Sequence, residues 1–195
     1  METTAYLSIG LLGLGLAASS GLNTFLPLLI LALAAKMQLF GVQLNGSFAW
    51  LASDVALGTL GIAAFAEIIA DKVPTVDHIL DAIGTVARPA AGALVAASVF
   101  HNSDPAMATL LGLIIGAPTA FSFHAAKAGT RATSTVGTMG LLNPALSFFE
   151  DMAAIILIFV ALLAPLLVPI FLIVFGFTLW KLLKLAKTKW RAKAI

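Results

Sequence analysis

Long apolar stretches alternate with short polar links along almost the whole chain. Apolar runs occupy residues 5–35, 55–70, 89–100, 106–123 and 152–180. A helix needs about 20 predominantly apolar residues to cross a bilayer, whereas a membrane β-barrel would give segments of about ten residues with alternating hydrophobicity. The pattern therefore predicts an all-α fold, that of a polytopic helical membrane protein.

Polar, glycine and proline positions divide these runs into about seven segments. We expect helices at about 5–18, 22–38, 48–71, 76–101 and 106–127, followed by a long apolar run at 145–182. About 20 residues cross the hydrocarbon core, so Pro165 and Pro169 are expected to divide this last run into two helices. The expected organisation is a single transmembrane domain over 1–182 with a basic cytoplasmic tail over 183–195.

Two interrupted elements stand out in this pattern. The first is Ser19–Pro27, and the second is the Gly/Thr-rich stretch Gly129–Pro144, which we expect to lack regular helix. Broken helices in corresponding positions of two halves point to the binding site in many transporters. We therefore expect two short or re-entrant segments, possible internal repeats at 5–72 and 106–182, and a site where both breaks approach Glu67 and Glu150.

Charge is scarce and unevenly placed. Charged residues make up 10% of the chain, and the mean hydropathy is +1.06. Of the 11 Lys and Arg residues, all but Lys36 fall on one side of the seven-segment arrangement. Cytoplasmic loops carry the excess of Lys and Arg, so the C-terminus is expected in the cytoplasm and the N-terminus outside.

The stretch 67–88 holds a large share of this scarce charge. Its candidate residues are Glu67, Asp71, Lys72, Asp77, Asp81 and Arg88. Glu67 and Asp71 are four residues apart and share a helical face. Asp77, Asp81 and Arg88 follow each other at spacings of four and seven and form another stripe. Charge inside a membrane is costly and usually functional, which predicts an ion or solute path. A solvated helix end and an interfacial amphipathic segment are the simpler alternatives.

A second polar group lies in the second half of the chain. Its members are His124, Lys127, Arg131, Asn143, Glu150 and Asp151. The three basic residues share a helical face, which indicates either an anion or phosphate site or pairing with the acidic residues of 67–88. Unpaired charge is costly in a low dielectric, so we expect the acidic and basic groups to meet in the fold.

Several classes of function find no support in the sequence. The chain has no cysteine, no H-E-x-x-H element, no P-loop and no histidine pair spaced for haem. We therefore expect no catalytic residues, no metal and no cofactor. The basic tail is typical of a membrane-surface anchor, and no nucleic-acid partner is expected.

Four stretches carry a resemblance to a known family. They are A-E-I-I-A-D-K-V-P-T-V-D-H-I-L-D, R-P-A-A-G-A-L, H-A-A-K-A-G-T-R and N-P-A-L-S-F-F-E-D. Together with S-G-L-N-T-F-L-P-L-L near the start, they resemble a bacterial integral-membrane family catalogued as domain of unknown function 4126, over about residues 10–165. The resemblance implies a place in the bacterial inner membrane. It also marks the charged residues named above, with Pro89 and Pro144, as the first to test.

The expected function is a small membrane transporter or channel for an ion or small polar solute. The charged cluster near the cytoplasmic side would line the path. The alternatives are a transporter of phosphate-bearing lipid headgroups, and a non-catalytic membrane subunit or assembly factor whose charges only pair with each other. The expected partners are membrane lipids, the ion or solute, and further copies of the chain.

Overall fold

The computed structural model describes residues 2–193, leaving out the side chains at 2, 74–75, 77–78, 179–180, 182–183 and 185–193. All regular elements in this part of the chain are helical, which confirms the predicted all-α class. Four helical stretches are long and apolar enough to cross a membrane, and one bent pair brings the number to five. The chain is a multi-pass membrane protein, in rough agreement with the seven predicted segments.

The order of elements follows the predicted division closely. It runs α1 (Glu2–Leu22), α2 (Leu26–Lys36), η1 (Leu39–Gly41), η2 (Gly46–Ala52), α3 (Asp54–Ala70), α4 (Pro74–Val99), α5 (Pro105–Leu111), the π-helical turn η3 (Gly112–Gly116), α6 (Ala117–Thr138), α7 (Asn143–Leu163), η4 (Pro165–Leu167) and α8 (Val168–Lys193). The predicted break near Pro165 and Pro169 is confirmed. Helix α8 also extends through 183–193, which the sequence pattern assigned to a tail.

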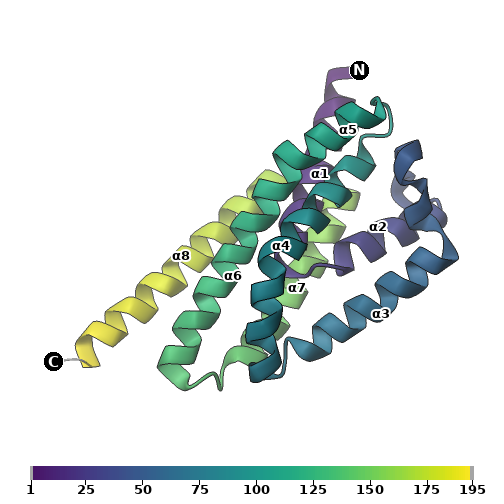
Figure 1. Cartoon of the computed structure of the whole chain (residues 1–195). Helices are drawn as coiled ribbons and strands as arrows, with labels where there is room; N and C mark the ends of the chain where they lie inside the picture. The colour runs from purple at the N-terminus through teal and green to yellow at the C-terminus, as the bar shows by residue number, and fades with distance from the viewer. Residues whose placement is uncertain (1, 194–195) are drawn as a thin grey trace.

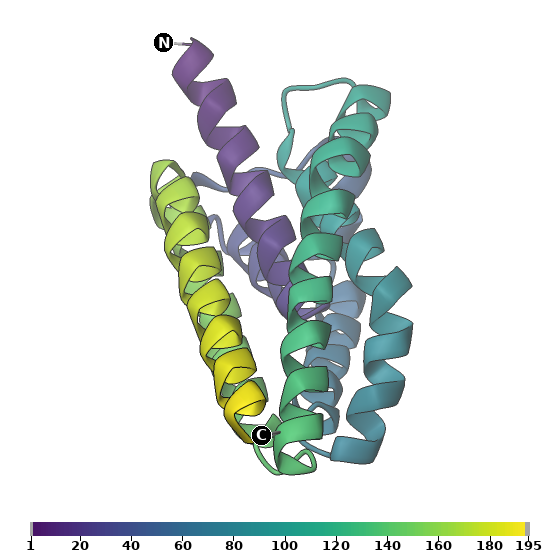
Figure 2. The same ribbon diagram turned by 90° about the vertical axis from the view of Figure 1, so that its left-hand side faces the viewer.

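Helix α1 lies at the centre of the bundle. It packs against α4, α6 and α7, and its C-terminal end stops about half-way along the molecule (Figure 2). Helix α2 leaves this point at an angle and runs to the side, where it packs against α3 (Figure 1). The junction between α1 and α2 is buried, because Asn23 and Thr24 are 0% and 5% exposed.

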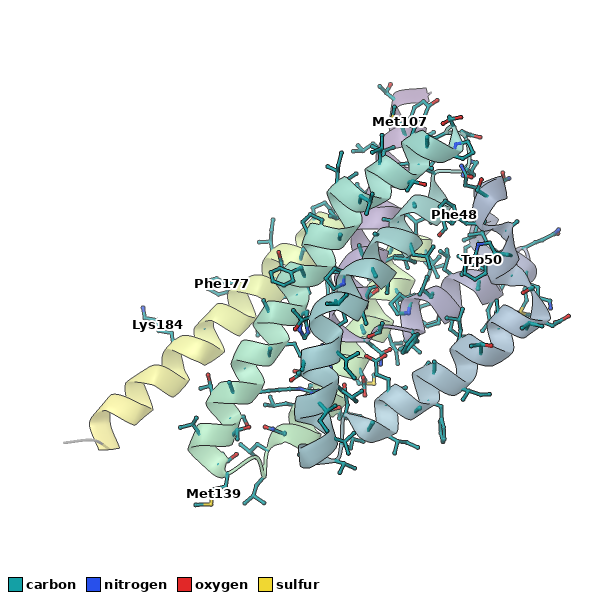
Figure 3. The ribbon with its side chains drawn as sticks, viewed as in Figure 1. Phe48, Trp50, Met107, Met139, Phe177 and Lys184 are labelled. Carbon is teal, nitrogen blue, oxygen red and sulfur yellow. The ribbon has the colours of Figure 1, made fainter. Side chains whose placement is uncertain are left out.

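The two ends of the bundle differ in character. Figure 3 places Phe48 and Trp50 of η2 toward the end that carries the N-terminus, and Met139 at the opposite end. Met139 and Gly140 join α6 to α7, both with positive φ. We call these two ends the N-terminal end and the Met139 end.

An apolar core fills the N-terminal half of the bundle. Leu16, Leu31, Val95, Leu157 and Ile158 are fully buried there. On α4 and α7 these apolar positions follow the polar ones in sequence. Each of these helices therefore carries polar side chains in the half nearer the Met139 end and apolar side chains in the other half.

Close helix packing holds α4 against η3 and α6. A Cβ atom added to Gly116 would lie 2.2 Å from the carbonyl oxygen of Gly92, and one added to Gly112 would lie 2.4 Å from that of Ala93. The G-x-x-x-G spacing of Gly112 and Gly116 thus serves close approach of two helices, the usual role of such spacing in membranes.

The expectation of a second broken element was wrong. Helix α6 continues through the Gly/Thr-rich stretch to Thr138, so only residues 139–142 form a turn. Hydroxyl groups of Thr130 and Thr133 donate to the carbonyl oxygens of Ala126 and Gly129, four residues earlier. These bonds satisfy the side chains within the helix. The proposed internal repeats stay a prediction.

Candidate functional site

The break between α1 and α2 is held on one side by Glu67 of α3. Its carboxylate accepts hydrogen bonds from the backbone N–H of Thr24 at 2.9 Å and from that of Phe25 at 3.3 Å. The Thr24 hydroxyl donates to the same carboxylate at 2.8 Å. The first N–H groups of a helix have no partner within it, and they attract negative charge. A buried acidic side chain from another helix therefore caps α2.

Basic side chains hold the other side of the break. Lys127 of α6 donates from Nζ to the carbonyl oxygen of Leu22 at 2.9 Å. Arg88 of α4 donates to that of Gly21 at 3.5 Å. These carbonyls belong to the last turn of α1, where cations are favoured. The break thus has carboxylate at its N–H groups and cations at its carbonyl groups.

A network of ion pairs joins α3, α6 and α7 next to this break. Lys127 Nζ lies 2.6 Å from Oδ2 of Asp71 and 3.6 Å from Oε2 of Glu150. Arg131 Nη2 lies 3.3 Å and 2.6 Å from the same two oxygens. Burial alone would raise the pKa of Asp71, but the positive charges of Lys127 and Arg131 hold the pKa below its usual range. The acidic and basic groups meet, as predicted.

Asp151 extends the network to α1 and the start of α4. Lys72 Nζ lies 3.1 Å from Oδ2 of Asp151, and the amide of Asn23 donates to Oδ1 at 3.4 Å. The Asn23 side-chain oxygen in turn accepts from the backbone N–H of Leu26 at 3.0 Å. Asn23 therefore links the break to α7.

Arg88 connects the break to His124. Its Nη1 lies 2.8 Å from Nδ1 of His124, and its Nη2 lies 3.5 Å from Oε1 of Glu67. A guanidinium group has only donors, so Nδ1 accepts and the imidazole is neutral with its proton on Nε2. That nitrogen lies 3.2 Å from the Thr85 hydroxyl. Asp81 completes this side at 3.7 Å from Arg88.

We call the assembled residues the polar core. They are Glu67, Asp71, Lys72, Asp81, Arg88, His124, Lys127, Arg131, Glu150 and Asp151. Ten of the twelve predicted site residues therefore come together. Asn143 lies outside the ion-pair network and donates to the Thr135 hydroxyl at 3.1 Å. The side chain of Asp77 lies outside the described residues.

A cavity reaches the polar core between α3 and α4. Its volume is about 220 Å³, and Thr24, Phe25 and Glu67 line it together with small or apolar side chains of Ala63, Leu80 and Gly84. A larger cavity of about 500 Å³ lies at the other end of α2, where Ala35, Gln38 and Gln43 contribute to its wall. Helix α2 thus has one cavity at each end.

Sequence reasoning missed two hydroxyl groups of the site, those of Thr24 and Thr85. Neither residue carries a charge. Only Thr85 could have been found, since it lies four residues after Asp81 and three before Arg88 and shares their stripe of α4. The Gly/Thr-rich stretch was expected to form part of the site as a broken element. Most of it is instead helical, and Arg131 of α6 enters the polar core from it.

Comparison with known proteins gives a family and no activity. No curated protein and no solved structure matches the chain. The profile described as "Domain of unknown function (DUF4126)" matches residues 11–185. This range contains the whole polar core and the α1–α2 break. The chain is a membrane-spanning helical protein that belongs to the DUF4126 family.

Proposed function

We propose that the protein is a small transporter or channel for an ion or small polar solute, with its path along α2. The observation that carries this proposal is the cavity between α3 and α4 that reaches Glu67 at the α1–α2 break. Broken helices with polar ends occur at the binding sites of many membrane transporters. A purely structural subunit has no need of a cavity at its buried charges.

The second cavity supports the same path. It lies at the C-terminal end of α2, and the cavity with Glu67 lies at the N-terminal end. The 11 residues of α2 span about 16 Å at about 1.5 Å per residue. A short helix with a cavity at each end is a suitable element to separate, or to connect, two compartments.

The charges of the polar core favour a cation over an anion or a phosphate headgroup. Lys127 and Arg131 are each engaged by Asp71 and Glu150, and Arg88 lies within reach of Glu67 and Asp81. An incoming phosphate would have to displace these carboxylates and would leave them unpaired in a low dielectric. The lipid-headgroup alternative therefore has weaker support.

The same proposal includes a location and an orientation. We place the protein in the bacterial inner membrane with the Met139 end in the cytoplasm and the N-terminus outside. Lys72 and the basic residues of α8 support this choice, because cytoplasmic segments carry the excess of Lys and Arg. Cysteines introduced at Gly46 and at Met139 should react with an impermeant reagent from opposite sides, and labelling from one side would contradict the orientation.

Flux through reconstituted vesicles tests the function. Vesicles with the wild-type protein should pass a small monovalent cation or proton faster than empty vesicles, and Glu67→Gln should change the rate severalfold. Asp54→Asn is the matched control, because it makes the same change at a side chain that is 93% exposed. Wild-type flux at the level of empty vesicles, or equal rates for all three proteins, contradicts the proposal.

A further inference from the structure

The charges of the polar core do not balance. Among the described side chains it holds five carboxylates and four cationic groups: Glu67, Asp71, Asp81, Glu150 and Asp151 against Lys72, Arg88, Lys127 and Arg131. His124 adds no charge, because its Nδ1 accepts from Arg88. An uncompensated charge inside a protein is costly, and such groups usually take up or release a proton instead.

Hydrogen bonding distinguishes the carboxylates of the polar core. Both oxygens of Glu67 accept from backbone N–H groups, and both oxygens of Asp151 accept from cationic or amide donors. Hydrogen bonds to both oxygens favour the charged form of a carboxylate. The geometry of Glu67 and Asp151 thus leaves neither residue with an oxygen that lacks a donor.

Asp71 and Glu150 differ from Glu67 and Asp151, and also from Asp81, which pairs with Arg88 at 3.7 Å. Lys127 and Arg131 approach both residues on a single oxygen, Oδ2 of Asp71 and Oε2 of Glu150. The second oxygen of Asp71, Oδ1, is buried and has no hydrogen-bond partner among the described residues. Because these two carboxyl groups share the same two cations, they are close neighbours. Like charges at such a distance disfavour each other, and one carboxyl group then holds a proton.

We propose that Asp71 and Glu150 form a proton-binding pair that carries one exchangeable proton at neutral pH. The proton binds one carboxyl oxygen, and the charge of the pair changes from −2 to −1. The described charged and titratable groups around the pair are Lys127, Arg131 and His124 of α6, Arg88 and Asp81 of α4, Glu67 of α3, Lys72 between α3 and α4, and Asp151 of α7. With the proton bound, the five carboxylates and four cations are electrically neutral together.

Glu150 is the member of the pair that exchanges this proton. Its side chain is 11% exposed, whereas that of Asp71 is 0% exposed. The cation contacts are divided between the two residues, because Lys127 lies closer to Asp71, at 2.6 Å against 3.6 Å, and Arg131 lies closer to Glu150, at 2.6 Å against 3.3 Å. Exposure therefore distinguishes the two residues, because partial exposure gives Glu150 a contact with the surroundings that Asp71 lacks. This inference rests on the proposed function in one respect: the proton would be the ion, or the coupling ion, of the path.

Infrared spectroscopy of the protein in lipid bilayers tests the pair directly. A protonated carboxylic acid has a C=O stretching band that an ionised carboxylate lacks, and the band shifts in D₂O when the proton exchanges. Wild-type protein at neutral pH should show this band with an exchange shift, and Glu150→Gln should lose it. Asp54→Asn, at the exposed carboxylate, should leave the band unchanged.

A second variant separates the pair from a general loss of folding. In Asp71→Asn the repulsion between the two carboxylates is gone, so Glu150 should ionise and the band should again disappear while the helical amide bands remain. Absence of the band from wild-type protein, or its persistence in both variants, overturns the proton-binding pair. The infrared spectra and the flux assay test the two proposals separately. An infrared band without any flux supports the proton-binding pair and contradicts the transport proposal.

Discussion

Two ion-paired regions of this protein illustrate opposite uses of charge. Lys36 and Asp54 pair at the N-terminal end with side chains that are 38% and 93% exposed, whereas Lys127 and Asp71 pair in the polar core with side chains that are both 0% exposed. Exposed pairs contribute about 0–1 kcal/mol. In a buried network, removal of one partner costs about 3–5 kcal/mol because the other charge stays buried. Burial therefore decides how much each ion pair contributes to stability.

The difference also concerns the backbone. The exposed pair joins the last residue of α2 to the first residue of α3. The polar core, in contrast, satisfies carbonyl groups of α1 and N–H groups near the start of α2. Unsatisfied backbone groups within a membrane are tolerated only where protein or a water-filled cavity receives them. The break between α1 and α2 therefore requires the polar core, which is also a candidate ion path.

The largest effect is expected for Lys127→Met. The change removes the closest cation of Asp71 and the donor to the Leu22 carbonyl. Unfolding free energy should fall by about 3–5 kcal/mol, measured by equilibrium unfolding in mixed detergent micelles. Lys36→Met is the matched control. A loss as small as that of the control would mean that water screens the polar core.

Glu67→Gln should give an intermediate effect. The amide keeps the size of the side chain but loses the charge that faces Arg88 and the N–H groups of Thr24 and Phe25. Loss of bonds to a buried charged group costs about 1–3 kcal/mol, and the same unfolding measurement should record it. A stability equal to wild type would show that the cap of α2 does not need a charge.

Asp54→Asn should have a small effect, below about 1 kcal/mol, because its partner Lys36 is partly solvated. The unfolding free energy is measured alongside that of Glu67→Gln. The two variants make the same change, carboxylate to amide, at an exposed and at a buried position. If both variants lose the same amount, the contrast between the two regions fails.

Salt should give the smallest change. Raising the ionic strength from about 0.1 M to about 1 M shortens the Debye length from about 10 Å to about 3 Å. A double-mutant cycle on Lys36 and Asp54 should lose its coupling energy, a few tenths of a kcal/mol, whereas a cycle on Lys127 and Asp71 should keep its value. Equal salt sensitivity of the two cycles would argue that both pairs are open to solvent.

The sequence predicts the polar core well because its residues are expensive in a membrane. Glu67 stands in an apolar run, and Arg88 and Lys127 stand close to the ends of two others, where a charge needs a partner; pairing follows from that requirement. The break at Asn23 was also predictable, because the apolar pattern stops there and Pro27 follows.

Local composition was a poor guide in the Gly/Thr-rich stretch. Low helix propensity predicted a loop, but Asp71 and Glu150 fix Arg131 near the start of this stretch. Tertiary contacts of that kind commonly override propensity. A partner such as Thr24 could not be predicted, since its hydroxyl lies on no charged stripe and gives no pattern until the helices are placed.

The π-helical turn at Gly112–Gly116 has a consequence for helical phase. Such a turn inserts one residue into an α-helix, and one residue corresponds to about 100° of rotation at about 3.6 residues per turn. The turn contains Gly112 and Gly116, which lie close against α4, and it joins α5 to the basic stripe of His124, Lys127 and Arg131 on α6. It therefore sets the angle between α5 and the charged surface of α6. Deletion of Leu113 would rotate this stripe relative to α5 by about a quarter of a revolution.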